Sequence, residues 1–256
     1  MLQIEQLAVL NDNYIYLLRD PATGHTGVVD PAVAEPVLEA LARLDWQLTH
    51  ILNTHHHSDH VGGNETLIRE TGCTVVGPRA DRARIPGIVT EVGDGDTFAL
   101  GTARAKVFDV PGHTRGHIAY WFEDSAALFC GDTLFALGCG RLFEGTPTQM
   151  WDSLSKLKAL PPATRVYCAH EYTQSNGRFA LSVEPANPLL VARMRRIDGL
   201  RATGQPTVPS TMAEECATNP FLRPDSREIQ HTLGLAGASL VEIFGATRAR
   251  KDIFRA

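Results

Sequence analysis

Apolar and polar positions along the first two-thirds of the chain form short apolar runs that alternate with turn-rich segments. The runs at residues 2–9 and 14–20 are joined by the turn-forming triplet Asn11-Asp12-Asn13, a pattern typical of two strands in a hairpin. Runs of the same kind predict further strands at residues 27–30, 50–53, 73–76, 98–100, 105–110, 118–122, 126–130 and 165–169.

Segments with a helical spacing of apolar residues lie between some of these strands, and beyond about residue 172 only such segments occur. At residues 34–44 the apolar positions recur at helical spacing and a proline stands near the start, which predicts an amphipathic helix. Helices are also predicted at residues 64–70, 150–160, 189–202, 212–217, 227–233 and 240–249. Because no strand is predicted beyond about residue 172, we expect an α/β domain over residues 1–172 and an all-helical domain over residues 173–256.

Composition and charge narrow the classes of partner. The chain has 256 residues, of which 43% are hydrophobic and 21% charged, as in ordinary globular proteins. No apolar stretch approaches the about 18 residues of a membrane span, and residues 1–14 do not resemble a signal peptide. We therefore expect a cytoplasmic protein with no membrane partner. A monomer is the expected state, although the sequence leaves the oligomeric state open. The net charge of −5 lacks the basic footprint of a nucleic-acid-binding protein, so no nucleic acid is expected.

The five cysteines do not predict a disulfide framework. Their number is odd, their spacing is wide and no CxxC motif occurs, which also argues against a thiolate zinc site. They are expected to be reduced and mostly buried. The residues are Cys73, Cys130, Cys139, Cys168 and Cys216.

A dense group of histidines and a carboxylate follows the predicted strand at residues 50–53. In the extended stretch after this strand, alternate side chains share a side, so His55 and His57 point one way and His56 the other. Imidazoles and carboxylates suit borderline divalent metals such as zinc. Four such side chains within six residues are too many for one ion with an open coordination position, so two ions are predicted. They are His55, His57, Asp59 and His60.

Three further candidate ligands stand where predicted strands end. His113, Asp132 and His170 each follow an apolar run and begin a loop, which is where α/β folds build their sites. Any one of these histidines alone would more commonly be a hydrogen-bonded structural residue, but their combination with the HxHxDH segment is a far more specific signal. The other histidines are expected to be structural or exposed, with His117 in a loop or beside the ligands. They are His25, His50, His56, His117 and His231.

Several longer segments surround these candidate ligands. They are Asn11-Asp12-Asn13-Tyr14, Pro111-Gly112-His113-Thr114-Arg115-Gly116-His117, Gly131-Asp132-Thr133-Leu134-Phe135, Gly138-Cys139-Gly140-Arg141 and Ala169-His170-Glu171-Tyr172. The HxHxDH segment resembles the metallo-β-lactamase superfamily, which implies a four-layer αββα sandwich with the metals at one edge. The longer segments and the helical tail resemble the hydroxyacylglutathione hydrolases (glyoxalase II enzymes) within it, over nearly the whole chain.

The resemblance implies how the ligands are shared. His55, His57 and His113 would bind one metal, Asp59, His60 and His170 the second, and Asp132 would bridge them. Two divalent ions are implied, with zinc favoured and iron or manganese as alternatives. Residues 1–172 would be the catalytic domain and residues 173–256 a helical domain that binds glutathione.

The resemblance also implies the reaction. It is hydrolysis of an S-(2-hydroxyacyl)glutathione such as S-lactoylglutathione, giving glutathione and a 2-hydroxy acid such as lactate, the second step of methylglyoxal detoxification. Two cations would lower the pKa of a bridging water, so that a hydroxide attacks the thioester. Asp59 would orient it and accept its proton, and the thiolate leaving group, with a thiol pKa of about 8.5, needs little acid assistance.

Glutathione carries carboxylates, so an acidic protein needs a local basic patch to bind it. Arg248 and Lys251 are three residues apart on a predicted helix and share a face. The alternative is that these cations only offset the helix dipole. The resemblance implies glutathione contacts from Arg141, Tyr172, Arg248 and Lys251. Two positions depart from the family pattern, with Arg141 for lysine and Phe143 for tyrosine, and Phe143 removes one hydroxyl contact.

Two further questions stay open from the residues alone. Asp30 either orders the metal-binding loop or only begins an Asp-Pro turn. The nearest alternative function is a persulfide dioxygenase with one iron on the same fold, against which the tail with Arg248 and Lys251 argues. A lactonase or β-lactamase is also compatible with the fold, and a nuclease is disfavoured by charge. A non-catalytic binding module would require a broken ligand set, and all seven positions are present.

Overall fold

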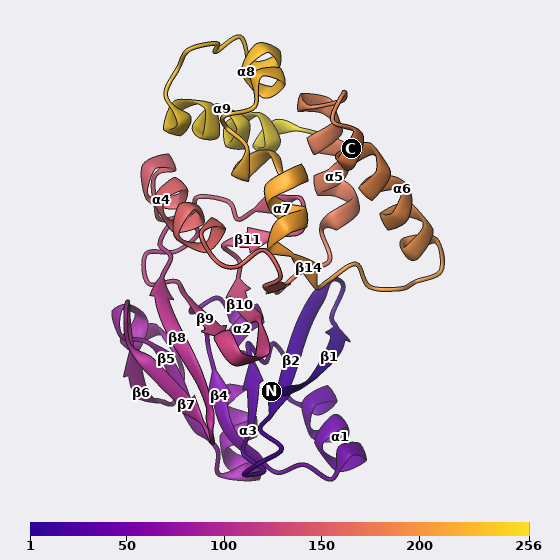
Figure 1. The fold of residues 1–256 in the computed structure, drawn as a ribbon. Helices are drawn as coiled ribbons and strands as arrows, with labels where there is room; N and C mark the ends of the chain where they lie inside the picture. The colour runs from indigo at the N-terminus through magenta and orange to yellow at the C-terminus, as the bar shows by residue number, and fades with distance from the viewer. Residues whose placement is uncertain (256) are drawn as a thin grey trace. The chain divides into compact units, whose positions relative to one another are not determined.

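The computed structural model describes residues 1–255 and divides into two compact units (Figure 1). Unit 1 consists of Met1–Val110 and Thr114–Gly131, and unit 2 of Pro111–His113 and the chain from Asp132 onward. The domain boundary predicted near residue 172 stays a prediction.

The first sheet of unit 1 contains six strands in sequence order. They are β1 (Gln3–Val9), β2 (Asn13–Arg19), β3 (Thr26–Val29), β4 (Leu48–Leu52), β5 (Thr74–Pro78) and β6 (Ile88–Val92). Strands β1 to β3 are antiparallel, whereas β3 to β6 are parallel. Parallel neighbours need crossover connections, which here contain α1 (Glu35–Leu44), α2 (Ser58–Val61), α3 (Asn64–Thr71) and the 3-10 helix η1 (Arg79–Arg84).

The two faces of this sheet have different partners. Alternate side chains of a strand point to opposite faces, so Ile15 and Leu17 of β2 join the apolar cluster that includes Val37 of α1 and Leu67 of α3. Tyr16 points the other way, and its ring lies 5.5 Å from that of Phe129. Helices therefore cover one face, and the second sheet packs on the other.

The strands of unit 1 in the second sheet are antiparallel neighbours in sequence order. They are β7 (Thr97–Leu100), β8 (Ala103–Asp109), β9 (Ile118–Phe122) and β10 (Ala127–Gly131), with the short 3-10 helix η2 (Glu123–Ser125) between the last two. The Tyr120 hydroxyl donates to the Asn53 carbonyl oxygen over 3.0 Å, which ties β9 to the end of β4. Unit 1 is thus a layer of helices on two packed sheets.

Unit 2 is mainly helical. Its helices are α4 (Pro147–Lys158), α5 (Thr173–Val183), α6 (Pro188–Ala202), α7 (Met212–Thr218), η3 (Pro220–Leu222), α8 (Arg227–Leu233) and α9 (Leu240–Ile253). Its strands are β11 (Leu134–Phe135), β12 (Gly138–Cys139), β13 (Arg165–Cys168) and β14 (Ser210–Thr211). Capping boxes that begin with Thr146, Thr211 and Ser239 satisfy the first amides of α4, α7 and α9.

Most predicted elements are confirmed within a few residues at their ends, and one expectation is wrong. The expectation that strands end near residue 172 is wrong, because Ser210–Thr211 pairs antiparallel with β13. Helix α5 and strands β6, β11 and β12 were not predicted from the sequence. No helix of the described chain is long and apolar enough to span a membrane, and all five cysteines are free thiols.

A buried carboxylate organises the interior of unit 2. Glu215 is fully buried and forms an ion pair with the buried Arg193 of α6. The same carboxylate accepts from the Leu137 amide over 2.9 Å and from the Asn219 side chain over 3.0 Å. These contacts join α6, α7 and the β11–β12 hairpin around one charge.

Removing this carboxylate should destabilise the protein strongly. Glu215→Ala leaves the Arg193 guanidinium buried without its counterion, which costs about 3–5 kcal/mol of unfolding free energy. Urea denaturation of the variant measures the loss. Glu70→Ala is the control, because Glu70 pairs with Arg69 on the surface and such pairs contribute about 1 kcal/mol or less. Equal losses in the two variants would contradict the central role of Glu215.

Candidate metal centre

The HxHxDH segment lies between β4 and α2, where the chain leaves the first sheet. His57 is the extended residue before α2, and Asp59 and His60 lie in that helix. His55 and His60 are buried, whereas the Asp59 side chain keeps 40% of its exposure. The Asn13 side chain donates to the Asp59 carboxylate and carbonyl oxygens, each over 3.2 Å. The first residue of β2 therefore holds Asp59 in position.

Asp30, just after β3, organises this segment through one carboxylate. It accepts from the Thr54 amide over 2.8 Å, from the Thr54 hydroxyl over 2.7 Å and from His60 Nδ1 over 3.0 Å. Because a carboxylate only accepts, His60 Nδ1 carries the proton, and the lone pair of the neutral ring lies on Nε2. Asp30 adopts a φ of 48°, which is unusual for a residue with a side chain and is concentrated at functional sites. Of the two interpretations of Asp30, the contacts support ordering of the metal-binding loop.

The same reasoning assigns the tautomer of His55. The single hydroxyl proton of Thr54 is donated to Asp30, so Thr54 Oγ1 accepts from His55 Nδ1 over 3.1 Å. The His55 lone pair then lies on Nε2, which is 3.1 Å from His57 Nδ1. The buried His117 ring stacks on His55 at 4.5 Å and 18°, as expected for a residue beside the ligands.

His56 faces away from this group, as alternation predicted. Its Nδ1 lies 2.9 Å from the buried Asp81 carboxylate, and Arg84 lies 3.1 Å from its Nε2. Asp81 also pairs with Arg84. His56 therefore belongs to a structural network on η1 and not to the candidate ligands.

Unit 2 holds three of the candidate ligands, and two of them are imidazoles that face the carboxylate of the third, Asp132. His113 Nδ1 donates to the Arg141 carbonyl oxygen over 2.9 Å, so its lone pair lies on Nε2. Asp132 Oδ2 is 3.3 Å from His113 Nε2, and Asp132 Oδ1 is 3.4 Å from His170 Nε2. In a charged hydrogen bond the donor nitrogen and the carboxylate oxygen are usually about 2.7–2.9 Å apart. Two donor atoms bound to one tetrahedral zinc ion, each at about 2.0–2.1 Å from the metal, are about 3.3 Å apart from each other. The two oxygens of Asp132 thus face two imidazoles at ligand-to-ligand spacing.

Two glycines permit this placement. Gly131, directly before Asp132, has a φ of +47°, and a Cβ there would lie 2.3 Å from Thr54 Oγ1. A Cβ on Gly140 would lie 2.0 Å from the Asp132 carbonyl oxygen. A side chain at either position would displace a residue of the candidate metal centre.

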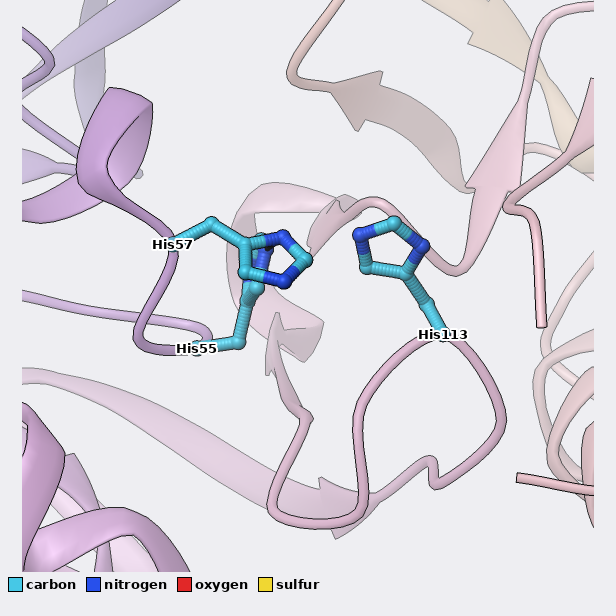
Figure 2. A group of neighbouring side chains, drawn as sticks. All are labelled: His55, His57 and His113. Atoms are coloured by element: carbon cyan, nitrogen blue, oxygen red, sulfur yellow. Dashed lines mark hydrogen bonds between the residues drawn. The ribbon is translucent and has the colours of Figure 1, made fainter. Parts of the chain in front are cut away.

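Three groups of ligand atoms in the described chain have a spacing that could hold an ion. Within each group the atoms lie within 4.8 Å of one another. Figure 2 draws the first of them. The groups are His55, His57 and His113; Asp59, His60 and His170; and Asp30, His55 and His60. The hydrogen bonds of Asp30 explain its place in the third group. The first two groups and Asp132 are therefore the candidate donor set, whose nitrogen and oxygen atoms fit divalent metals.

Aromatic rings pack on two of these imidazoles. Tyr172 stacks on His170 with ring centroids 4.7 Å apart and planes at 0°, and Phe135 meets both edge-on. The Phe143 ring lies 5.2 Å from His113 and is 62% exposed. Tyr172 and Phe143 therefore present ring surface next to candidate ligands.

The predicted basic patch is a cluster of three cations in unit 2. Arg248 is buried, donates to the Cys139 carbonyl oxygen over 2.8 Å and lies over the Phe221 ring. Lys251 donates to the Ser175 carbonyl oxygen over 3.2 Å. Burial, and then the charges of Arg248 and Arg141, lower the pKa of Lys251 to about 8. The side chain of Arg141 is 63% exposed.

One residue of this cluster was not predicted. Asp252 lies 3.0 Å from Arg248 and 4.0 Å from Arg141. An acidic residue at a helix end gives no distinctive sequence signal, so only the three-dimensional contacts identify it.

Comparison with known proteins gives a consistent result over the whole chain. Residues 10–170 match the family model of the metallo-beta-lactamase superfamily, and residues 171–254 match that of the hydroxyacylglutathione hydrolase C-terminus. The chain is 62% identical to a hydroxyacylglutathione hydrolase from Methylococcus capsulatus over all of both chains, and 57% identical to one from Rhodospirillum rubrum over 99% of both. The crystal structure of ETHE1 from Myxococcus xanthus is similar with 29% identity and a TM-score of 0.68, covering 97% of each chain. These matches confirm the predicted metallo-β-lactamase fold with a helical C-terminal region.

Asp30→Asn should weaken metal binding. The side-chain amide of asparagine carries a donor NH2 group in place of one oxygen that now accepts. Either Thr54 or His60 therefore loses its hydrogen bond, and the ring of His60 is held less firmly in its orientation. Loss of such an orienting contact typically lowers metal affinity by about 10–100-fold. Competition with a chromogenic chelator measures the affinity. Asp124→Asn, at an exposed carboxylate of η2, is the control, and an affinity equal to that of the control would contradict the orienting role.

Proposed function

The chain belongs to the hydroxyacylglutathione hydrolase family of the metallo-β-lactamase superfamily, and we propose that it hydrolyses the thioester bond of an S-(2-hydroxyacyl)glutathione to glutathione and a 2-hydroxy acid. The observation that carries the proposal is the match of residues 171–254 to the family model of the hydroxyacylglutathione hydrolase C-terminus. The matched residues include the cations Arg248 and Lys251. The metal ligands alone would fit several reactions of this superfamily. The C-terminal region is what favours a glutathione substrate.

The donor set supports two divalent ions. His55, His57 and His113 would hold one, Asp59, His60 and His170 the other, and Asp132 would contact both. When bound, such ions lower the pKa of water between them and polarise a carbonyl oxygen. Zinc fits the nitrogen-rich set, with iron or manganese as alternatives.

The remaining steps belong to side chains of the chain itself. The Asp59 carboxylate, whose side chain is 40% exposed, would orient the attacking water and accept its proton at Oδ. Arg141, Arg248 and Lys251 would bind the carboxylates of glutathione, and Tyr172 would also contact the glutathione moiety. Glutathione then leaves as a thiolate, which needs little protonation because the pKa of its thiol is about 8.5. The reaction therefore needs no general acid to protonate the leaving group.

Several finer points stay predictions. They are lactoyl as the acyl group, the monomeric state, the cytoplasmic location and the assignment of residues 173–256 as the glutathione-binding domain. The match of residues 171–254 to the C-terminal family model supports the last of these.

Thiol release from S-lactoylglutathione tests the function directly. The metal-loaded protein should release glutathione rapidly, and a strong chelator should reduce the rate by at least about a hundredfold, because the developing charge loses its metal stabilisation. Readdition of zinc to the chelated protein should restore the rate. A fully metallated protein that releases no thiol would contradict the proposal, and oxygen uptake with glutathione persulfide would then test the dioxygenase alternative.

The pH dependence of KM tests the role of Lys251. With its pKa lowered to about 8, Lys251 is charged below that pH and loses its charge as pH rises through it. The KM for the thioester should therefore rise above pH 8, by about threefold to tenfold for the loss of one ion pair. Lys251→Arg, which stays charged, should abolish the rise. A wild-type KM that is constant to pH 9.5 would contradict this role.

A further inference from the structure

A carboxylate of the protein contacts two of the three cations in the cluster formed by Arg141, Arg248 and Lys251. Asp252 Oδ1 lies 3.2 Å from Arg248 Nε, 3.0 Å from Arg248 Nη2 and 4.0 Å from Arg141 Nε. The Nε and Nη2 hydrogens form the edge of a guanidinium that binds a carboxylate bidentately. Asp252 therefore occupies the edge of Arg248 that a ligand carboxylate would use.

Helix stability does not explain the position of Asp252. It stands in the last turn of α9 (Leu240–Ile253), where the helix dipole disfavours a negative charge. The pair also has its arginine N-terminal to its acid, which is the less favourable order for an i,i+4 pair. The contact with the guanidinium is what favours the carboxylate there.

Arg248 is held in place without Asp252. Its Nη1 donates to the Cys139 carbonyl oxygen over 2.8 Å, and the guanidinium lies 5.0 Å above the Phe221 ring. The residue is 4% exposed, whereas the Asp252 side chain is 42% exposed. The cation is thus fixed by buried contacts, and the anion is the partner that can move into solvent.

We propose that Asp252 is a built-in competitor of glutathione, a carboxylate that must leave the Arg248 edge before a carboxylate of the ligand can bind there. This inference rests on the proposed function, because it concerns the affinity of that same site for glutathione. Substrate and product share the glutathione carboxylates, so Asp252 weakens the binding of both. Its consequence is a higher KM and weaker inhibition by released glutathione than the three cations alone would give.

Asp252→Asn tests the competition. Asparagine keeps an oxygen that can accept from Arg248 but removes the charge, so a ligand carboxylate displaces it more easily. The KM for S-lactoylglutathione and the inhibition constant of glutathione should fall together by about fivefold, the effect of one partly exposed ion pair. Measurement at pH 6.5 keeps Lys251 charged in both proteins, because its pKa is about 8. Asp124→Asn is the control for net charge, and its two constants should equal those of the wild type.

The outcomes separate this inference from the function on which it rests. A wild type that neither hydrolyses the thioester nor binds glutathione overturns the proposed function before any variant is compared. With an active wild type, unchanged constants in Asp252→Asn overturn the competition, and raised constants would show that Asp252 positions Arg248 instead. Asp252→Ala checks the result, since it should lower both constants as well while Cys139 still holds Arg248.

Amidated ligands identify the carboxylate that competes. Glutathione has two carboxylates, and each can be amidated in turn. For one of the two amides, wild type and Asp252→Asn should bind with equal affinity, because that ligand no longer has the anion that displaces Asp252. A fivefold difference that persists for both amides would overturn the proposal.

Discussion

The hydrogen bonds accepted by the buried Asp30 carboxylate constrain the candidate metal centre more than any other interaction. Through Thr54 and His60 they determine which nitrogen of two imidazoles carries the proton. An imidazole binds a metal only through an unprotonated nitrogen, so a ring with the wrong tautomer would present a proton to the ion. The unusual backbone conformation of Asp30 is tolerated because β3 and β4 hold its neighbours in register. The parallel sheet is thus the rigid support from which the ligand directions follow.

Patterns that depend on chain neighbours could be predicted from the sequence, and contacts between distant segments could not. Strand alternation placed His55 and His57 together and His56 apart, because a period of two follows from backbone geometry. Helix α5 was missed because its sequence includes Gly177, which disfavours helix. A Cβ on Gly177 would lie 1.9 Å from the Met194 sulfur. The glycine at this position allows α5 to pack closely against α6, and the sequence of α5 alone does not show that constraint.

The candidate ligand set could be proposed from the sequence for a related reason. Seven polar residues at the ends of apolar runs have no local purpose, and their spacing matches a known family. Their roles depend on second partners such as Thr54, Asn13 and the Arg141 carbonyl oxygen, which carry no metal-binding signature. Asp252 is the clearest case, because its helix position alone suggests an unfavourable exposed acid, and only Arg248 explains it.

Two arginine–carboxylate pairs in unit 2 show how the burial of the carboxylate distinguishes a structural ion pair from one that can open to bind a ligand. Arg193 and Glu215 are both buried, and either partner alone would carry an uncompensated charge, so the pair cannot open without great cost. Arg248 is equally buried, but its partner Asp252 is 42% exposed and can be solvated when it leaves. Because a ligand carboxylate would take the place of Asp252, Arg248 keeps a counterion during the exchange, and no buried charge is left uncompensated. An anionic ligand that binds and leaves in every turnover needs a cation whose counterion it can replace. Arg248 meets this condition because Asp252 is partly exposed. Arg193 does not, because Glu215 is fully buried.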